Sequence, residues 1–154
     1  MNYTGRYGLE INPFIKNGKD VLVETNEYKE VKFRLNYLLQ TKGFGILTGG
    51  AGRGKTTSVR QWANELNPAA YKVVYISLST VTVIEFYRQM ALNLGIEPYY
   101  KKVDNFRAIQ AIIEKYKREK RITPVFIFDE ANYMKSGILN DLKILFNFEM
   151  DSKD

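Results

Sequence analysis

The sequence contains no cysteine and no histidine. Without cysteine there can be no disulfide framework and no thiolate metal site. Without histidine, both the usual zinc ligand and the usual general base near neutral pH are missing, so acid–base chemistry has to come from Asp, Glu, Lys or Tyr. Among these groups a carboxylate is the natural candidate.

Long apolar runs are also missing. The longest runs, such as residues 125–128 (VFIF), are far too short to cross a bilayer, and the N-terminal residues lack the charged and then apolar pattern of a signal peptide. We therefore expect a cytoplasmic protein without membrane insertion. The 154 residues suffice for one domain with a real core, and the 45% of hydrophobic residues exclude a disordered chain.

The charge balance is positive, with 23 Lys and Arg against 17 Asp and Glu and a formal net charge of +6. Such an excess favours a polyanionic partner, for example nucleic acid or the phosphates of a nucleotide. Solubility alone explains the same excess equally well. The charge therefore leaves both interpretations open.

Hydrophobic periodicity predicts helices that alternate with strands after an irregular lead-in over residues 1–25. Helices are expected from a cap at Thr25 or Asn26 up to Gly43, over 56–66 and 82–94, from a cap at Asp104 to the charged stretch 117–121, and over 136–148. Strands are expected over 43–48, 71–78 and 124–128, the last one buried on both faces because it is apolar throughout. The alternation predicts an α/β fold with a mainly parallel sheet.

A glycine-rich turn lies between the first predicted strand and the next helix. Residues 49–56 (GGAGRGKT) match G-x-x-x-x-G-K-[ST], the P-loop pattern, without a mismatch. In this loop the backbone N–H groups curl around a phosphate, Lys55 reaches the β- and γ-phosphates, and the Thr56 hydroxyl binds Mg²⁺. The alternative is a flexible turn with an exposed lysine. The predicted nucleotide-binding residues are Gly49, Gly50, Ala51, Gly52, Arg53, Gly54, Lys55, Thr56 and Thr57.

Two carboxylates, Asp129 and Glu130, end the last predicted strand. In P-loop proteins an acid at this place holds Mg²⁺, and a neighbouring glutamate orients and deprotonates the attacking water. We predict the first role for Asp129 and the second for Glu130, with Lys55 as the other catalytic residue. The alternative is that both acids merely cap the next helix.

Four segments together resemble the ExeA-type AAA+ ATPases: residues 8–14 (GLEINPF), 43–49 (GFGILTG), 54–57 (GKTT) and 128–132 (FDEAN). That group includes secretion-pathway ATPases and ATP-dependent transposase helpers of the IstB, TnsC and MuB kind. The resemblance implies the P-loop NTPase fold, a three-layer α/β/α sandwich. It also implies one AAA+ ATPase domain over residues 1–154, with its core in 43–154, that binds ATP and Mg²⁺ and forms a homo-oligomer.

The same resemblance suggests further site residues. The lead-in around Leu9 to Phe14 and the start of the first helix near Tyr28 would border the adenine. A polar residue at the end of the second strand, Ser77 or Ser79, would lie near Glu130 and restrain it until a partner binds. Either serine can equally be an ordinary hydrogen-bonding residue at a strand end.

The resemblance also has a missing part. In AAA+ proteins the acidic strand is followed by a sensor strand, by arginines that complete a neighbour's site, and by a helical lid, and none of these is present here. The resemblance therefore implies a C-terminally truncated core with a gap in its sheet and unpaired strand edges. We expect weak or absent ATPase activity from the chain alone, and a tendency to exchange segments or aggregate.

The leading functional hypothesis is an ATP-driven switch that holds double-stranded DNA and recruits a transposase or a similar protein. One alternative is a secretion-pathway ATPase that acts on protein or envelope partners. Another is a P-loop small-molecule kinase, which the Asp-Glu pair disfavours because water activation suits hydrolysis. Basic residues form either a DNA-facing patch or a solvated helix end: Lys101, Lys102, Lys115, Lys117, Arg118, Lys120 and Arg121.

Overall fold

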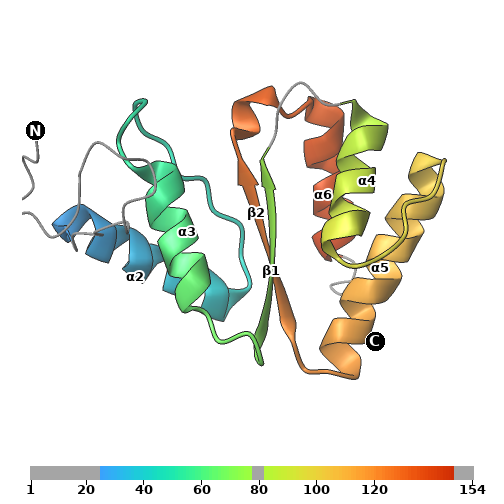
Figure 1. Cartoon of the computed structure of the whole chain (residues 1–154), viewed down its shortest axis with the longest axis horizontal. Helices are drawn as coiled ribbons and strands as arrows, with labels where there is room; N and C mark the ends of the chain where they lie inside the picture. Colours follow the sequence, from blue (N-terminus) through green and yellow to red (C-terminus); the bar gives the residue numbers. More distant parts are fainter. Residues whose placement is uncertain (1–24, 78–81, 148–154) are drawn as a thin grey trace, which may run out of the picture. The chain divides into compact units, whose positions relative to one another are not determined.

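A computed structural model of the chain describes residues 25–77 and 82–147 (Figure 1). The chain divides into two compact units, Met1–Gly45 and Ile46–Asp154. Each unit is described by itself, and the organisation as a single domain stays a prediction. None of the described helices is long and apolar enough to cross a membrane.

The first unit contributes one described helix, α2, over Asn26–Thr41. Thr25 caps it, because its side-chain oxygen accepts a hydrogen bond of 3.1 Å from the backbone N–H of Tyr28. The helix ends where Lys42 adopts a left-handed backbone with φ of 52°. The predicted helix is thus confirmed, whereas the lead-in with its proposed adenine contacts at Leu9 to Phe14 lies outside the described residues.

The second unit is built on a parallel sheet of two strands, β1 over Tyr71–Ser77 and β2 over Thr123–Asp129. Their register pairs Tyr71 with Thr123 at one end and Ser77 with Asp129 at the other. The carboxyl ends of both strands therefore meet at one edge of the sheet. This is the edge where α/β proteins place their ligands.

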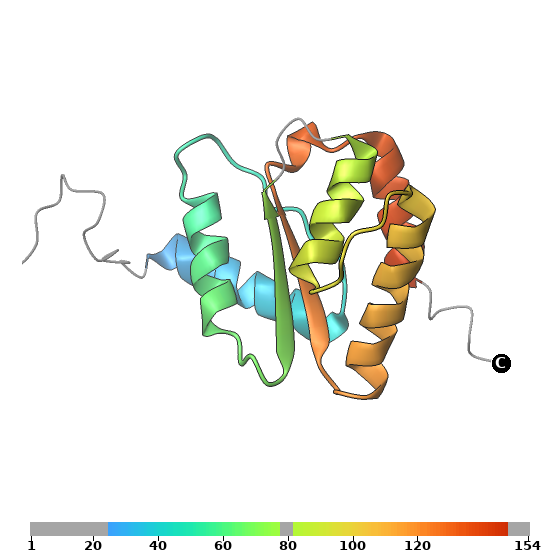
Figure 2. The same ribbon diagram turned by 45° about the vertical axis from the view of Figure 1, so that its right-hand side comes forward.

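Helices cover both faces of this sheet, as Figures 1 and 2 show. Helix α3, Lys55–Glu65, lies on one face, and α4, Val83–Asn93, α5, Lys102–Arg118, and α6, Ser136–Asn147, lie on the other. The side with three helices holds the apolar core. Its buried members are Val74, Ile76, Phe86, Tyr87, Met90, Ala91, Leu94, Ile109, Ile138, Leu142 and Leu145. The predicted three-layer α/β/α arrangement is confirmed.

The strand predicted over residues 43–48 is wrong, since this segment has no regular secondary structure. Its Ile46 side chain is 92% exposed. A strand forms only where a neighbour accepts and donates its backbone hydrogen bonds, and within the described residues the sheet consists of β1 and β2 alone. Within the described residues β2 has only β1 as a neighbour, and it is half-buried along its whole length rather than buried on both faces.

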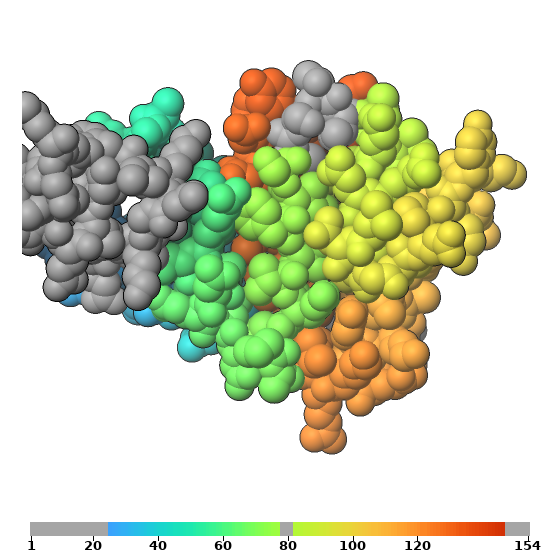
Figure 3. Space-filling view, in the orientation of Figure 1, coloured from blue at the N-terminus to red at the C-terminus, as the bar shows by residue number. Residues whose placement is uncertain are grey.

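The start of α5 also differs from the prediction. Lys101 is the N-cap, and Asp104, the predicted cap, lies in the first turn of the helix. The cause is Asn105, which is fully buried and bonds three backbone groups of the segment before the helix. Its side chain accepts from the N–H of Tyr99 at 2.9 Å and donates to the carbonyls of Tyr99 and Lys101 at 2.8 and 2.9 Å. Side chains of α4 and of this segment form a continuous surface in Figure 3.

A polar cluster joins the three helices on the core side. The Tyr87 hydroxyl of α4 donates to Asp141 Oδ2 of α6 at 2.8 Å, and Lys102 Nζ of α5 lies 2.5 Å from the same oxygen. The Lys102 ammonium also lies 5.5 Å from the centre of the Tyr87 ring. Burial raises the pKa of the Asp141 carboxyl, but the bonds from Lys102 and Tyr87 outweigh burial and hold the pKa below its ordinary value of 3.8.

We expect this cluster to contribute less to the free energy of unfolding as the pH becomes acidic. A carboxyl whose pKa is depressed by folding stabilises the protein above its unfolded-state pKa and stops doing so as pH falls through its folded-state pKa. Replacing Asp141 by Asn should lower the free energy of unfolding by about 1–2 kcal/mol at pH 7. The difference from wild type should shrink below pH 3.8. Urea unfolding at pH 7 and pH 3 measures this, with Asp104→Asn as control, and a difference independent of pH would contradict the account.

Candidate active site at the carboxyl edge of the sheet

The glycine-rich loop leads directly into helix α3. Gly52 and Gly54 have φ of 73° and 72°, left-handed values that glycine adopts without strain. Gly54 is the N-cap of α3, and the Ser58 N–H donates to its carbonyl at 2.8 Å. The first N–H groups of the helix therefore have no partner inside the helix and, with the helix dipole, favour an anion at this end.

Lys55 is folded over the loop that precedes it. Its Nζ donates to the carbonyl oxygens of Gly49 and Gly50 at 2.7 and 2.8 Å. The ammonium is therefore held close to the loop backbone instead of extending into solvent. This geometry differs from the alternative of a free, exposed lysine on a flexible turn.

Asp129 joins the loop helix to the sheet. Its Oδ2 accepts a hydrogen bond of 2.8 Å from Thr56 Oγ1, at the start of α3, and one of 2.5 Å from the Tyr75 hydroxyl on β1. Its Oδ1 accepts from the backbone N–H of Glu130 at 3.0 Å. The structure thus brings together two residues, Thr56 and Asp129, that the sequence predicts to share a metal ion.

These contacts keep the carboxylate charged. The Tyr75 hydroxyl contributes most to the lowered pKa of Asp129, burial opposes it, and Thr56, the Glu130 amide and the Arg60 charge lower it further. The pKa of Tyr75 is raised, first by burial and then by its bond to Asp129. The pair is therefore a protonated phenol that donates to an ionised carboxylate.

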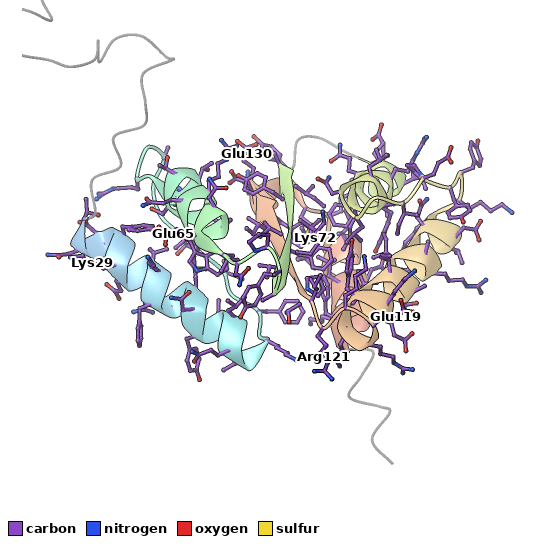
Figure 4. All side chains as sticks on the ribbon, turned by 60° about the horizontal axis from the view of Figure 1, so that its bottom comes forward. Lys29, Glu65, Lys72, Glu119, Arg121 and Glu130 are labelled. Atoms are coloured by element: carbon purple, nitrogen blue, oxygen red, sulfur yellow. The ribbon has the colours of Figure 1, made fainter. Side chains whose placement is uncertain are left out.

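Glu130 has an unusual backbone conformation and an exposed side chain. Its φ is 56°, in the left-handed region that non-glycine residues adopt mainly where a site requires it. It precedes the short helix η1, Ala131–Tyr133, but its side chain makes no capping bond to that helix. Figure 4 shows Glu130 at the carboxyl edge of the sheet, at the opposite end from Arg121. The capping alternative for Glu130 is therefore not what the structure shows.

Ser77 is one of the two serines predicted to restrain Glu130. It pairs in the register with Asp129, the residue that precedes Glu130. Ser79 lies outside the described residues. Tyr28, predicted to border the adenine, is buried within α2 of the first unit. Its role at the nucleotide stays a prediction.

Two residues of this site, Tyr75 and Arg60, were not predicted from the sequence. Arg60, one turn along α3 from Thr56, lies with its guanidinium carbon 5.1 Å from the centre of the Tyr75 ring. Tyr75 is the partner of Ile127 in the register and shares its sheet face with Asp129. The signal that could have identified Tyr75 is the alternation of side chains along β1. Val74 and Ile76 are buried on the core side, so Tyr75 between them points to the other side.

The oxygen atoms at this edge fit Mg²⁺ with nucleotide phosphates. Magnesium is commonly bound by one or two protein oxygens, with phosphates and water completing its shell. The Thr56 hydroxyl and the Asp129 carboxylate supply two hard oxygen donors from neighbouring elements. In the part of the chain that the structure describes, no group of three or more Asp and Glu residues could hold a metal ion by itself.

The chain is similar to a secretion pathway protein and matches a family of AAA domains. General secretion pathway protein A of Aeromonas hydrophila is 29% identical over 156 residues, which cover 98% of this chain but only 28% of that protein. No solved structure matches significantly. A family model described as an AAA domain matches residues 38–154, which is most of the chain and includes both acidic and glycine-rich motifs. The chain therefore belongs to the AAA domain family.

Proposed function

We propose that this chain binds ATP and hydrolyses it in a Mg²⁺-dependent reaction. The observation that carries the proposal is the Thr56–Asp129 hydrogen bond of 2.8 Å, which joins the phosphate-loop helix to the acidic end of β2. A helix start, which favours an anion, and two oxygen atoms that would bind a metal ion lie next to each other there. A nucleotide triphosphate with its magnesium ion needs both.

Each residue has a role that its place supports. The backbone N–H groups of Gly49, Gly50, Ala51, Gly52, Arg53, Gly54, Lys55, Thr56 and Thr57 are the proposed phosphate cradle. Lys55, which lies over this loop, would offset the charge of the terminal phosphates. Thr56 and Asp129 would hold Mg²⁺, whose positive charge neutralises charge that develops on the phosphates.

Glu130 is the proposed general base. Its side chain is exposed at the edge of the sheet and makes no capping bond, so it is free to orient a water molecule and take its proton. An acid beside the metal-binding aspartate suits water attack better than transfer to a second substrate. Hydrolysis is therefore favoured over the kinase alternative, and phosphate release without an added acceptor distinguishes the two.

For the partner we favour a protein-directed ATPase of the secretion type over a DNA-bound transposition helper. One relative is a secretion pathway protein, although this chain spans little more than a quarter of it. Two of the basic residues pair with neighbouring acids, Lys115 with Glu119 at 3.9 Å and Arg118 with Glu114 at 2.6 Å, which is in keeping with a solvated helix end. A homo-oligomer stays a prediction.

The binding step is tested by replacing Lys55 with Ala. Loss of a charged hydrogen-bonding group that contacts phosphate should weaken ATP binding about 10- to 150-fold. Titration of a fluorescent ATP analogue in Mg²⁺ measures this. Lys143→Ala, which removes an exposed lysine of α6, is the matched control and should bind like wild type. Equal affinity of wild type and Lys55→Ala would contradict the proposed site.

The partner class is tested separately with duplex DNA at two salt concentrations. A protein-directed ATPase should bind DNA weakly and without regard to nucleotide. Tight, salt-sensitive binding that requires ATP would instead support the transposition hypothesis and make the basic cluster of α5 a target for mutagenesis.

A further inference from the structure

Among the described residues bonded to Asp129, Tyr75 is the one that has no part in the proposed reaction. It lies on β1, two residues before the strand ends, and its hydroxyl donates to Asp129 Oδ2 at 2.5 Å. The same oxygen accepts from Thr56 at 2.8 Å, while Oδ1 accepts from the Glu130 amide at 3.0 Å. Within the described residues, these three donors fix the plane in which the Asp129 carboxylate lies.

The ring that carries this hydroxyl is itself held in place. The guanidinium of Arg60, from α3, lies over the ring at 5.1 Å from its centre, a distance within the range of a cation–π contact. The backbone of Tyr75 lies within the paired length of β1, where Tyr75 is opposite Ile127. The direction of the hydroxyl is thus set by α3 and β1 together.

The two hydroxyl donors differ in what binding a metal would do to them. Thr56 is a proposed ligand, so its oxygen would have to serve the metal ion as well as Asp129. Tyr75 lies on β1 and is not a proposed metal ligand, so its hydroxyl would donate to Asp129 alone. Of the two hydroxyl bonds, the one from Tyr75 can therefore persist when Thr56 binds the metal ion. Hydrogen-bonding partners that orient a metal ligand in this way strengthen metal binding.

We propose that Tyr75 is a positioning residue for the metal site: its hydroxyl, held by Arg60, orients the Asp129 carboxylate toward Mg²⁺. This inference rests on the proposed function, because it assumes that Asp129 serves a magnesium ion. It adds a residue from the neighbouring strand to a site otherwise made of the glycine-rich loop and the acidic strand end. A phenylalanine in this position would fill the same space but leave Asp129 Oδ2 with one donor.

The test compares Tyr75→Phe with wild type in the Mg²⁺ dependence of ATP binding. The readout is the fluorescence of an ATP analogue, titrated with Mg²⁺ at fixed nucleotide and, separately, with nucleotide in EDTA. We expect the Mg²⁺ concentration at half-effect to rise about 10- to 100-fold, while affinity in EDTA stays the same. Tyr71→Phe removes a hydroxyl from the same strand and sheet face, away from Asp129, and should behave like wild type.

The outcomes separate the two proposals. If wild type binds with a clear Mg²⁺ dependence and Tyr75→Phe does the same, the inference fails and the proposed function stands. Equal weakening with Mg²⁺ and in EDTA would also overturn the inference, since it would mean that Tyr75 only supports the fold. If wild type shows no Mg²⁺-dependent binding at all, the proposed function fails and the inference fails with it.

Arg60→Met provides a second variant. It removes the charge over the ring and keeps much of the length of the side chain, so the ring is held less firmly while the hydroxyl remains. A shift in Mg²⁺ dependence that is smaller than that of Tyr75→Phe and in the same direction is expected. An unchanged dependence would overturn the part of the proposal that concerns Arg60.

Discussion

Replacing Glu130 with Gln should abolish most phosphate release and leave ATP binding nearly unchanged. Glutamine has the size of glutamate but cannot take a proton from water, and a general base contributes about 10²- to 10⁴-fold to the rate of such reactions. The left-handed backbone at Glu130, with φ of 56°, is no harder for glutamine to adopt than for glutamate. The expected result is therefore a loss of rate without a loss of structure.

Single-turnover phosphate release at saturating ATP measures the rate, and a titration with a fluorescent ATP analogue measures binding. Single-turnover conditions suit a chain whose activity we expect to be weak. Glu97→Gln, which changes an exposed acid between α4 and α5, is the control and should release phosphate like wild type. Undiminished release by Glu130→Gln would show that another group activates the water.

Replacing Phe86 with Ala should destabilise the second unit by about 3–5 kcal/mol. Phe86 on α4 is 0% exposed, and its ring centre lies 5.3 Å from that of Tyr87 and 5.6 Å from that of Phe128. The substitution leaves a cavity between α4 and the sheet, beside Phe128, which directly precedes Asp129. Because total stabilities of about 5–15 kcal/mol are usual, the loss would be a large share.

Urea unfolding followed by circular dichroism measures this loss. Leu92→Ala is the matched control: Leu92 lies on the same helix, but 59% of it is exposed. Its removal should change the free energy of unfolding by no more than about 0.5 kcal/mol. Similar effects of the two substitutions would mean that Phe86 does not belong to the core of this unit.

The parts of the site that depend on consecutive residues were predictable. The pattern of residues 49–56 requires only glycines and a lysine at fixed spacing, and the acidic pair at Asp129 follows directly on an apolar strand. The cap of α2 was predictable as well, since Thr25, one of the two residues predicted to cap this helix, accepts the N–H of Tyr28. Such features are local, and local chemistry determines them.

The parts that depend on contacts between distant residues were not predictable. Residues 43–48 have the composition of a strand, but composition does not reveal whether a neighbouring strand is available to pair with them. The bond from Tyr75 to Asp129 depends on the register of β1 and β2, which the sequence does not state. Helix α5 begins earlier than predicted because a buried Asn105 holds the preceding segment. The burial of an asparagine is not visible in a single sequence.

The most direct test of the account is a calorimetric titration of ATP into the wild-type chain, once with Mg²⁺ and once with EDTA. We expect one binding site per chain and clearly tighter binding with Mg²⁺, because Thr56 and Asp129 then contribute through the metal ion. Absence of binding with Mg²⁺, or equal affinity in both conditions, would contradict the claim that the glycine-rich loop and Asp129 form one nucleotide site.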